Sequence, residues 1–402
     1  MSRFESRPAW TASEVRRGVE ELLTVFEDRL PARDARVLIK PNLNNDLVAL
    51  VGNSTDLRVL AALIEGLLNR GYHDLIVADG SNVGVHRRGI DTMKRLRVDR
   101  LAERYGVELL DLNQDQGVPI TLHGGGRPRV AKSVLDADFL ITVPKVKTHA
   151  EAGLSCALKN QVGVCVGQDK REMHRDLGRN IVALNRALLP DLVLVDGLIG
   201  MEGNGPGDGE PFRLGVLAMC DDPFLNDLAV CRLVGMPWER VPYLVHAFEQ
   251  GVLSGEHQAQ VESVQRRHRI RQAPVRSRLA ELSEARSLNW LKLAVRPIID
   301  STPAVLRAAY KLGVVQDVYS LEDDLVLGIR REREDCGDCV RCEEVCPTWL
   351  PAEAIGVRTG PEDCIGCLYC WWVCPDGVIE LEGEVGHLQR QIDRYADVVR
   401  GL

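Results

Sequence analysis

The stretch VLIKPNL at residues 37–43 sets the expectation for the fold. It opens with three consecutive apolar residues, as expected of a strand that is buried on both faces. After Thr55, a candidate N-cap, apolar side chains recur at helical spacing between residues 57 and 68, and Gly71 then ends the pattern. A buried strand followed by an amphipathic helix predicts the first βα unit of a parallel sheet.

The same alternation of apolar runs and amphipathic segments continues to about residue 250. A further helix is expected around residues 91–105. The pattern predicts an α/β domain over residues 1–250, with a mostly parallel sheet flanked by helices. Its other expected strands lie at residues 75–78, 107–112, 139–143, 192–195 and 214–219.

Eight of the 12 cysteines form two copies of one spacing near the end of the chain. Each copy reads C-x2-C-x2-C-x3-C-P, the run with which bacterial-type ferredoxins hold two [4Fe–4S] clusters. In those ferredoxins the fourth cysteine of each run binds the other cluster, so the spacing predicts two crossed ligand sets. The first set is Cys336, Cys339, Cys342 and Cys374, and the second set is Cys364, Cys367, Cys370 and Cys346.

Two other uses of these cysteines are disfavoured. Zinc sites usually pair two short cysteine knuckles across a longer gap, often with histidine, and neither run contains a histidine. A disulfide framework requires an oxidising compartment. The first 17 residues are polar and do not resemble a secretory signal, and no apolar run reaches the length of a membrane span. We therefore expect a cytoplasmic protein without membrane attachment.

The rest of the chain divides into two further expected domains. Residues 251–325 are predicted to be a helical, basic connector, with an arginine-rich stretch at 265–278 and helices around 287–295 and 303–312. Residues 326–402 are predicted to be a small ferredoxin-like α+β domain. Residues 331–402 carry 15 acidic and 7 basic side chains, and the whole chain has a net charge of −8. This balance disfavours nucleic acid as a partner.

Lysines mark a candidate ligand site in the first domain. Only nine of the 50 cationic residues are lysines, yet five of these lie between Lys132 and Lys170. Lysine where arginine is the default suggests that a compact charge or a movable pKa is needed. Chance clustering is the alternative. VPKVKTH at residues 143–149 follows an expected strand, as Lys40 does, and ligands of open α/β sheets bind beyond the carboxyl ends of strands.

These segments together resemble the family called domain of unknown function 362. Its members carry I-K-P-N-L near the start, P-K-x-K-T-H centrally, L-K-N with a glycine soon after, and a D-G-x-x-x-M-E-G-x-G-P loop, here at residues 196–206. The resemblance covers about residues 36–250, and a ferredoxin-like module is a frequent companion. One departure is that the usual D-x-x-A-x-D pattern reads here as Asp222 to Asp227 without the alanine.

The convergent cations and amides favour an anionic or carbonyl-bearing ligand. His149 is the expected proton donor near neutral pH. A lysine among other lysines can also have a lowered pKa and donate a proton. The expected catalytic residues are Lys145, Lys147, His149 and Lys159. The expected substrate-binding residues are Lys40, Asn42, Asn160 and Glu202. The structural alternative is that some of these cations cap strand ends or pair with carboxylates.

The leading hypothesis is an iron–sulfur oxidoreductase. Two [4Fe–4S] clusters would take electrons from an external donor, such as a ferredoxin, flavodoxin or reductase, and reduce an anionic small molecule on the α/β domain. Neither a P-loop nor a G-x-G-x-x-G fingerprint for a flavin or nicotinamide is recognised. The alternatives are a non-catalytic electron-transfer or redox-sensing protein and a cofactor-assembly factor.

Overall fold

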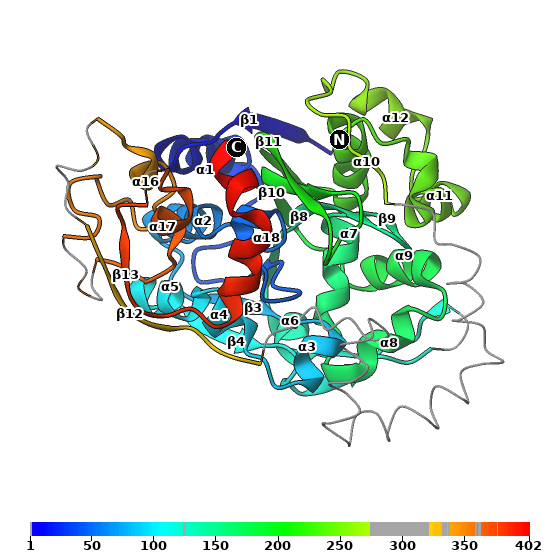
Figure 1. The fold of residues 1–402 in the computed structure, drawn as a ribbon. Helices are drawn as coiled ribbons and strands as arrows, with labels where there is room; N and C mark the ends of the chain where they lie inside the picture. The colour runs from blue at the N-terminus through cyan, green and yellow to red at the C-terminus, as the bar shows by residue number, and fades with distance from the viewer. Residues whose placement is uncertain are drawn as a thin grey trace, which may run out of the picture. The chain divides into compact units, whose positions relative to one another are not determined.

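A mixed sheet organises the first 250 residues of the computed structural model, which describes residues 2–123, 126–273, 321–331, 336, 338–357, 360, 363–375 and 377–402 (Figure 1). The described strands run in the order β1-β11-β10-β7-β2-β3-β4, with β8 and β9 joined to β10. Strands β7, β2, β3 and β4 are parallel, β10 joins β7 in parallel, and β11 and β1 close the other edge in antiparallel pairing. The predicted mostly parallel sheet is therefore confirmed. The strands are β1 Phe4–Pro8, β2 Val37–Pro41, β3 Leu75–Asp79, β4 Glu108–Asp111, β7 Phe139–Val143, β8 Lys145–His149, β9 Gly153–Ser155, β10 Leu192–Glu202 and β11 Glu210–Cys220.

Two hydrophobic cores cover the two faces of the sheet. Val37 and Ile39 of β2 face one core and Leu38 faces the other, as the alternation of side chains along a strand requires. Both faces are buried, which is why these strands are mainly apolar, with polar residues such as Lys40 and Asp79 near their carboxyl ends. The first core is packed by α1 Ala12–Val25, α2 Leu57–Asn69 and α5 Val98–Tyr105, and the second by α7 Ala157–Asn160, α9 Leu177–Ala187, α10 Pro223–Leu233 and α11 Pro242–Glu249 (Figure 1).

The predicted helices differ from the observed ones in two details. Asp56, not Thr55, caps α2, because its side chain accepts the backbone N–H of Arg58. The helix expected at residues 91–105 is split into α4 Thr92–Arg95 and α5, with Arg97 between them in the left-handed region at φ 61°. The remaining short elements are β5 Gly117–Pro119, β6 Arg129–Ala131, α3 Val83–Arg87, α6 Lys132–Asp136, α8 Lys170–Met173 and α12 Gly255–Val261.

The order of the strands creates a switch point between β2 and β7. From β2 the chain first builds β3 and β4 on one side, and later β7 and β10 on the other side. Adjacent strands whose connections leave in opposite directions open a crevice at their carboxyl ends, where open α/β sheets bind ligands. Lys40 and Asn42 lie at the end of β2, as expected from the sequence.

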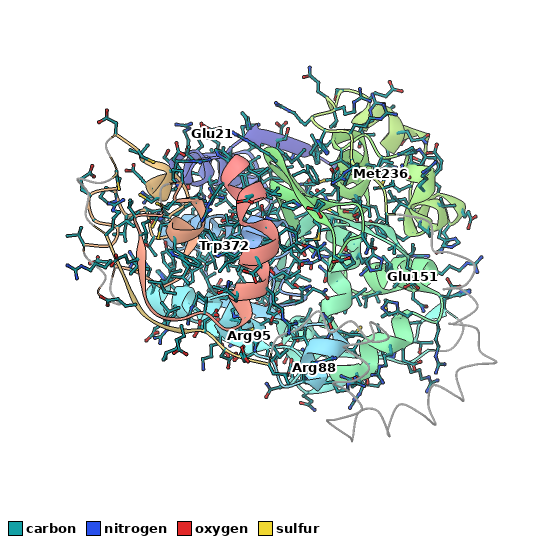
Figure 2. The ribbon with its side chains drawn as sticks, viewed as in Figure 1. Glu21, Arg88, Arg95, Glu151, Met236 and Trp372 are labelled. Carbon is teal, nitrogen blue, oxygen red and sulfur yellow. The ribbon has the colours of Figure 1, made fainter. Side chains whose placement is uncertain are left out.

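The C-terminal residues form a small module against the first domain. Strands β12 Leu325–Arg330 and β13 Glu380–Glu384 pair in antiparallel fashion, and α16 Arg341–Glu344, α17 Tyr369–Val373 and α18 His387–Gly401 complete the described part. Trp372 is buried in α17, which packs against α18 (Figure 2). Residues 1–273 and 321–402 belong to one compact unit, whereas the predicted connector helices at 287–295 and 303–312 lie outside the described residues.

Polar contacts and a shared core attach this module to the sheet domain. Arg95 forms ion pairs with Asp46 at 2.6 Å and with Asp323 at 2.7 Å (Figure 2). The indole N–H of Trp349 donates to Glu65 at 3.0 Å. Buried side chains of the module belong to the same hydrophobic core as those of α1 and α2. The module is thus packed as part of one folded unit.

Candidate functional site

A polar pocket opens at the switch point of the sheet. Four predicted site residues line it, namely Asn42, Lys147, Lys159 and Asn160. The pocket therefore lies where the strand order places a ligand crevice. Its other lining residues are Asn44, Asp79, Gly80, Asn82, Val83, Ser155, Val162, Gly163, Lys170, His174 and Pro206.

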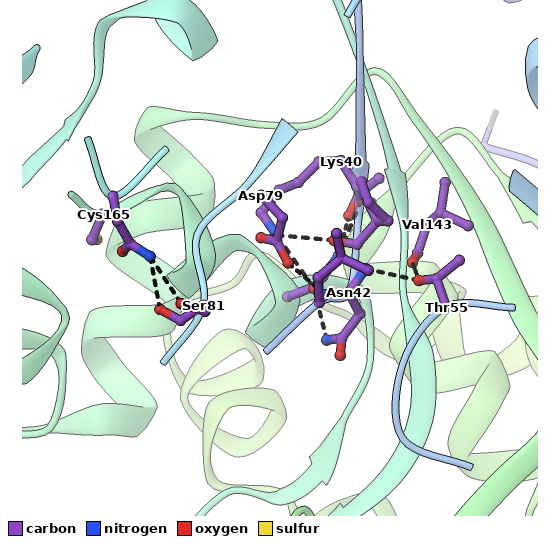
Figure 3. A network of polar contacts seen from close by, with 12 residues as sticks. Lys40, Asn42, Thr55, Asp79, Ser81, Val143 and Cys165 are labelled. Atoms are coloured by element: carbon purple, nitrogen blue, oxygen red, sulfur yellow. Dashed lines mark hydrogen bonds and ion pairs between the residues drawn. The ribbon is translucent and has the colours of Figure 1, made fainter. Parts of the chain in front are cut away.

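A buried ion pair ties together the strand ends beneath the pocket. The amine of Lys40, fully buried in β2, lies 2.6 Å from Asp79 Oδ1 at the end of β3 (Figure 3). The other oxygen of Asp79 accepts the backbone N–H of Leu43 at 2.6 Å. Asn160 donates to Thr142 Oγ1 at 2.9 Å and so reaches β7. These contacts satisfy the buried charges and fix the pocket floor.

Lys147 is a buried lysine with neutral partners. Its amine donates to Asn42 Oδ1 and to the carbonyl of Asn53, both at 2.8 Å. Burial, followed by the neighbouring charges of Lys159 and Lys145, lowers the pKa of Lys147 to about 7. This amine can therefore release or accept a proton near neutral pH.

Lys159 is the least satisfied cation of the pocket. Within the described part of the chain, its amine has no hydrogen-bonded or ion-paired partner, although it lines the cavity. Burial lowers its pKa to about 8, against an opposing contribution from Glu151. Lys170 lines the same cavity but donates to the carbonyl of Cys165 at 2.6 Å and to Asn113. Lys159 is consequently the cation best placed to bind an incoming anion.

Glycine is required where the pocket wall meets the buried pair. A side-chain carbon on Gly163 would lie 2.5 Å from Asp79 Oδ1 and 2.7 Å from the Lys40 amine. One on Gly80 would lie 2.6 Å from the carbonyl of Gly163. The glycine that follows the L-K-N segment thus allows the backbone to approach the ion pair closely.

Besides Lys40, which lies beneath the pocket, three predicted site residues do not line it. Lys145 is fully buried, and its amine pairs with Asp196 at 2.8 Å, because β8 runs beside β10. Glu202 is held by His268 Nε2 at 2.9 Å and Arg271 Nε at 2.6 Å. His149 accepts two backbone N–H groups through Nδ1, each at 3.1 Å. Lys145 therefore matches the alternative stated from the sequence, in which a cation pairs with a carboxylate.

His174 and Asp227 were not among the predicted site residues. His174 lies on the pocket lining, and its Nδ1 is 3.0 Å from Glu151 Oε2. Asp227 accepts the backbone N–H groups of Ala157 and Leu158, at 2.8 and 3.1 Å. It thereby fixes the start of α7, the short helix that carries Lys159 and Asn160. For Asp227, the signal was the aspartate pattern that opens α10.

The second predicted cysteine set lines one cavity in the C-terminal module. Cys346, Cys364, Cys367 and Cys370 converge on it from both cysteine runs, together with apolar side chains that include Ile329 and Ile355. Four convergent cysteines in an apolar shell fit the donor set and the shielding that an iron–sulfur cluster needs. Burial, followed by the neighbouring thiols, raises the pKa of Cys370.

The first predicted set, like the second, combines two buried and two partly exposed cysteines. Cys342 and Cys374 are buried, whereas Cys336 and Cys339 are partly exposed. Arg331 Nη1 donates to Cys342 Sγ at 3.0 Å, a kind of contact that tunes a cluster's potential. No three His, Cys, Asp or Glu side chains among the described residues converge as ligands of a single metal ion would. Cysteines of a cubane bind separate irons and are spaced more widely.

Comparison with known proteins identifies both parts. Residues 37–232 match the family model for the Domain of unknown function (DUF362). Below, 'DUF362 domain' denotes the segment that matches this model. Residues 358–380 match the model of a 4Fe-4S binding domain, which covers the second cysteine run. The resemblance stated from the sequence is confirmed for both parts: the chain combines a segment that matches DUF362 with a segment that matches a 4Fe-4S binding domain.

Known proteins resemble larger parts of the chain. A thylakoid-associated protein of Synechocystis is 28% identical over 304 residues, which cover 69% of this chain and 82% of that protein. Two solved structures match about half of the chain at low similarity. The lactate racemase apoprotein of Thermoanaerobacterium thermosaccharolyticum has a TM-score of 0.32 and 13% identity, with 54% of each chain covered. A Thermotoga maritima protein has a TM-score of 0.28 and 12% identity, with 52% of this chain and 55% of that chain covered. This chain therefore spans about half of each solved structure.

The pocket gathers the kinds of groups that anion binding and proton transfer require. Lys159 supplies an unpaired charge, Lys147 an amine that titrates near neutral pH, and His174 a ring oriented by Glu151. Amides of Asn42 and Asn160 lie on the same wall.

No described helix has the length and apolar character required to cross a membrane.

Proposed function

We propose that this chain is an iron–sulfur reductase whose substrate is an anionic small molecule bound in the DUF362 pocket. The observation that carries the proposal is Lys159, a cation that lines the pocket and has no partner among the described residues. A cavity that presents an unpaired charge at the switch point of an open sheet is suited to a carboxylate or phosphate ester.

The cofactor complement of the proposal is two [4Fe–4S] clusters. Cys346, Cys364, Cys367 and Cys370 would hold one, since they already line one cavity. The four cysteines of the first set would hold the other. When bound, such clusters supply electrons one at a time. Two electrons and two protons together convert a double bond into a single bond with two new bonds to hydrogen.

The pocket side chains have separate roles in this reaction. Lys159 binds the anionic end of the substrate, and the amides of Asn42 and Asn160 orient it. His174, held by Glu151, donates one proton, and Lys147 donates the second because its pKa is about 7. The same two cations stabilise negative charge that develops as electrons arrive. Lys40 positions Asp79 and Asn160. Lys145, His149 and Glu202 lie outside the pocket lining and are not assigned a contact with the substrate.

An external one-electron donor completes the proposal. A ferredoxin, a flavodoxin or a reductase would deliver electrons to the module, in the reducing cytoplasm that suits thiolate ligands. The same protein without a substrate would be an electron carrier or redox sensor. Anion binding in the DUF362 pocket distinguishes the two possibilities.

The test combines a metal count with one matched pair of variants. Protein purified without oxygen should contain eight irons and bind sulfate, measured by calorimetry. Lys159→Met should keep the irons and lose most sulfate affinity, by about tenfold or more for one buried charge-assisted contact. Lys94→Met, at an exposed lysine of α4, is the control and should bind as the parent does. Colourless protein with bound zinc, or sulfate binding that ignores Lys159, would contradict the proposal.

A further inference from the structure

Residues 53–57 contact Asn42 and Lys147, two residues that line the polar pocket, which is called the lysine pocket below. The backbone N–H of Asn42 donates to Thr55 Oγ1 at 2.7 Å, and the N–H of Thr55 returns to the carbonyl of Asn42 at 3.0 Å. Thr55 Oγ1 also donates to the carbonyl of Val143 at 2.8 Å, and Asn53 accepts the Lys147 amine (Figure 3). This short segment is therefore bonded directly to two pocket residues.

The opposite side of the same segment faces the second cysteine set. Tyr369 is 3% exposed, and its hydroxyl lies 3.5 Å from the backbone N–H of Leu57. It lines the cavity of the four cysteines. It also lines a second, narrow cavity together with Cys367, Ser54 and Thr55. Tyr369 thus lies between the second cysteine set and residues 54–57, which contact the pocket residue Asn42.

The first cysteine set has a different environment. Next to Cys342, the carbonyl of Glu344 accepts Arg58 Nη1 at 3.1 Å, and the same nitrogen donates to the carbonyl of Trp10. Arg341 reaches the carbonyl of Arg400, near the exposed end of α18, at 2.9 Å. Among the described residues, no cysteine of the first set lines either of the two cavities that Tyr369 lines.

We propose that Tyr369 and residues 54–57 are the protein bridge between the second cysteine set and the lysine pocket. The second set is then the pocket-side cofactor site, and the first set is the site that meets the external donor. Electron tunnelling declines steeply with distance and is faster through packed, hydrogen-bonded atoms than across a gap, so a continuous bridge decides which site serves the substrate. This inference rests on the proposed function and adds the direction of delivery within it.

The first test measures distances in the loaded protein. A nitroxide on His174→Cys marks the pocket mouth, and one on Arg400→Cys marks the far end of α18. Labelling is selective because the cysteines outside the module are buried. The protein is poised so that one cluster at a time is reduced and paramagnetic. The cluster nearer to position 174 should be the one farther from position 400. If the same cluster is the nearer one for both labels, the assignment is overturned.

The second test examines the bridge by light-driven electron injection. A ruthenium photosensitiser attached to the new thiol of the His174→Cys variant injects electrons toward the oxidised clusters after a flash. Tyr369→Leu should slow this transfer several-fold, Tyr369→Phe should keep the parent rate because the ring remains, and Trp371→Leu in the same helix should leave it unchanged. A Tyr369→Leu rate equal to that of the parent would exclude the bridge.

Iron content and cluster absorbance are measured in every sample. If Tyr369→Leu protein holds fewer irons than the parent, its transfer rate is set aside. The bridge is then judged from the distance test and from Tyr369→Phe alone. Eight irons and sulfate binding with the wrong distance pattern would refute the bridge and leave the reductase proposal intact. Missing irons or missing sulfate binding in the unlabelled protein would refute the proposed function itself.

Discussion

Individual lysines carry most of the chemistry inferred for this protein. Lys40, Lys145 and Lys147 are almost fully buried, yet each has a different partner: a carboxylate for the first two, and an amide and a carbonyl for the third. A buried ammonium paired with a carboxylate keeps its charge, whereas one with neutral partners loses its proton more easily. The partner, more than the lysine itself, therefore decides which residues titrate.

Sulfate affinity should fall as the pH rises from 7 to 9. The pKa of Lys159 is about 8 and that of Lys147 is about 7, so both amines lose their charge in this range instead of near 10.5. Sulfate keeps its charge throughout, so the change reports the protein. Calorimetry across this range measures it. Lys159→Arg is the control and should retain binding at pH 9, because guanidinium stays protonated. A flat profile in the parent protein would contradict the assignment.

Replacing Asp227 with asparagine should destabilise the fold and weaken sulfate binding together. The carboxylate accepts two backbone N–H groups of α7 and the hydroxyl of Tyr243, and losing these contacts should cost about 1–3 kcal/mol. Thermal unfolding and calorimetry measure the two effects. Tyr243→Phe is a milder control that keeps the carboxylate and should affect binding less.

The same variant has an expected pH signature. Burial raises the pKa of Asp227 to about 6, above its usual 3.8, so the folded state holds this proton more tightly than the unfolded state. Protonation therefore stabilises the fold, and this contribution is lost as the pH rises from about 4 to about 6. The stability of the parent relative to Asp227→Asn should decline over that range. An increase would contradict the raised pKa.

Single residues were predicted from the sequence where local order determines their position. Asn42 and Asn160 follow their strands or helix directly, so their place at the sheet edge was correctly expected. Lys145 was expected in the pocket, but its amine turns to Asp196, whose position depends on the non-local pairing of β8 with β10. No spacing in the sequence reports such a partner.

Among the described elements, the start of α2 carries a cluster of buried charged side chains. Asp56 caps the helix, pairs with Arg58 at 2.8 Å, and donates its backbone N–H to Asp196 at 2.6 Å. Burial would raise the pKa of Asp56, but Arg58 holds it below its usual value. The cap, the ion pair and the carbonyl of Glu344 thus join one helix end to both the sheet and the module.

Arg58→Met should be among the most destabilising single changes in the chain. It leaves the carboxylate of Asp56 buried without its partner, which should cost about 3–5 kcal/mol. Denaturant unfolding followed by circular dichroism measures the loss. Arg17→Met, at a side chain 67% exposed, is the matched control and should stay within about 0.5 kcal/mol of the parent. Asp56→Asn added to Arg58→Met should recover part of the stability. Equal stability of the two single variants would refute this account.

Helices and strands were predicted well where both faces of the element are buried. They were predicted less well where an element is only partly buried or where its end depends on a single residue. Strands β2, β3 and β7 are buried along their whole length, so their apolar runs identified them. The break between α4 and α5 depends on one left-handed residue, Arg97, which is not a glycine and gave no signal. Strand β1 is polar and only partly buried, and the sequence did not indicate that it pairs with β11.

At the scale of the whole molecule, the module and the DUF362 domain share one hydrophobic core. Cys342, Cys346 and Cys370 belong to the same buried cluster as side chains of α1 and α2. The cysteine spacing predicted the module and its ligand sets, but not this packing, because the contact is made by surfaces far apart in the sequence. The cofactor residues are consequently also part of the structural interior.

Removing iron should therefore destabilise the whole folded unit. An anaerobic chelator would remove the iron from eight thiolate ligands. A cofactor that binds the folded state preferentially contributes its binding energy to stability, and this contribution would be lost. We expect a melting temperature lower by several degrees in one cooperative transition, measured by calorimetry, and recovery after reconstitution with iron and sulfide. A separate early transition for the module alone would contradict the shared core.

The Lys40–Asp79–Asn160 contacts at the strand ends have a consequence for the evolution of ligand choice. Each of these polar groups already has a partner within the protein. An anion that enters the pocket would therefore exchange its hydration shell for charges that are already in place, and the surrounding structure would need little rearrangement. Substitutions at the rim, such as at His174 or Asn82, can then alter what is accepted while the interior is preserved. Diversification of such proteins is expected to concentrate at that rim.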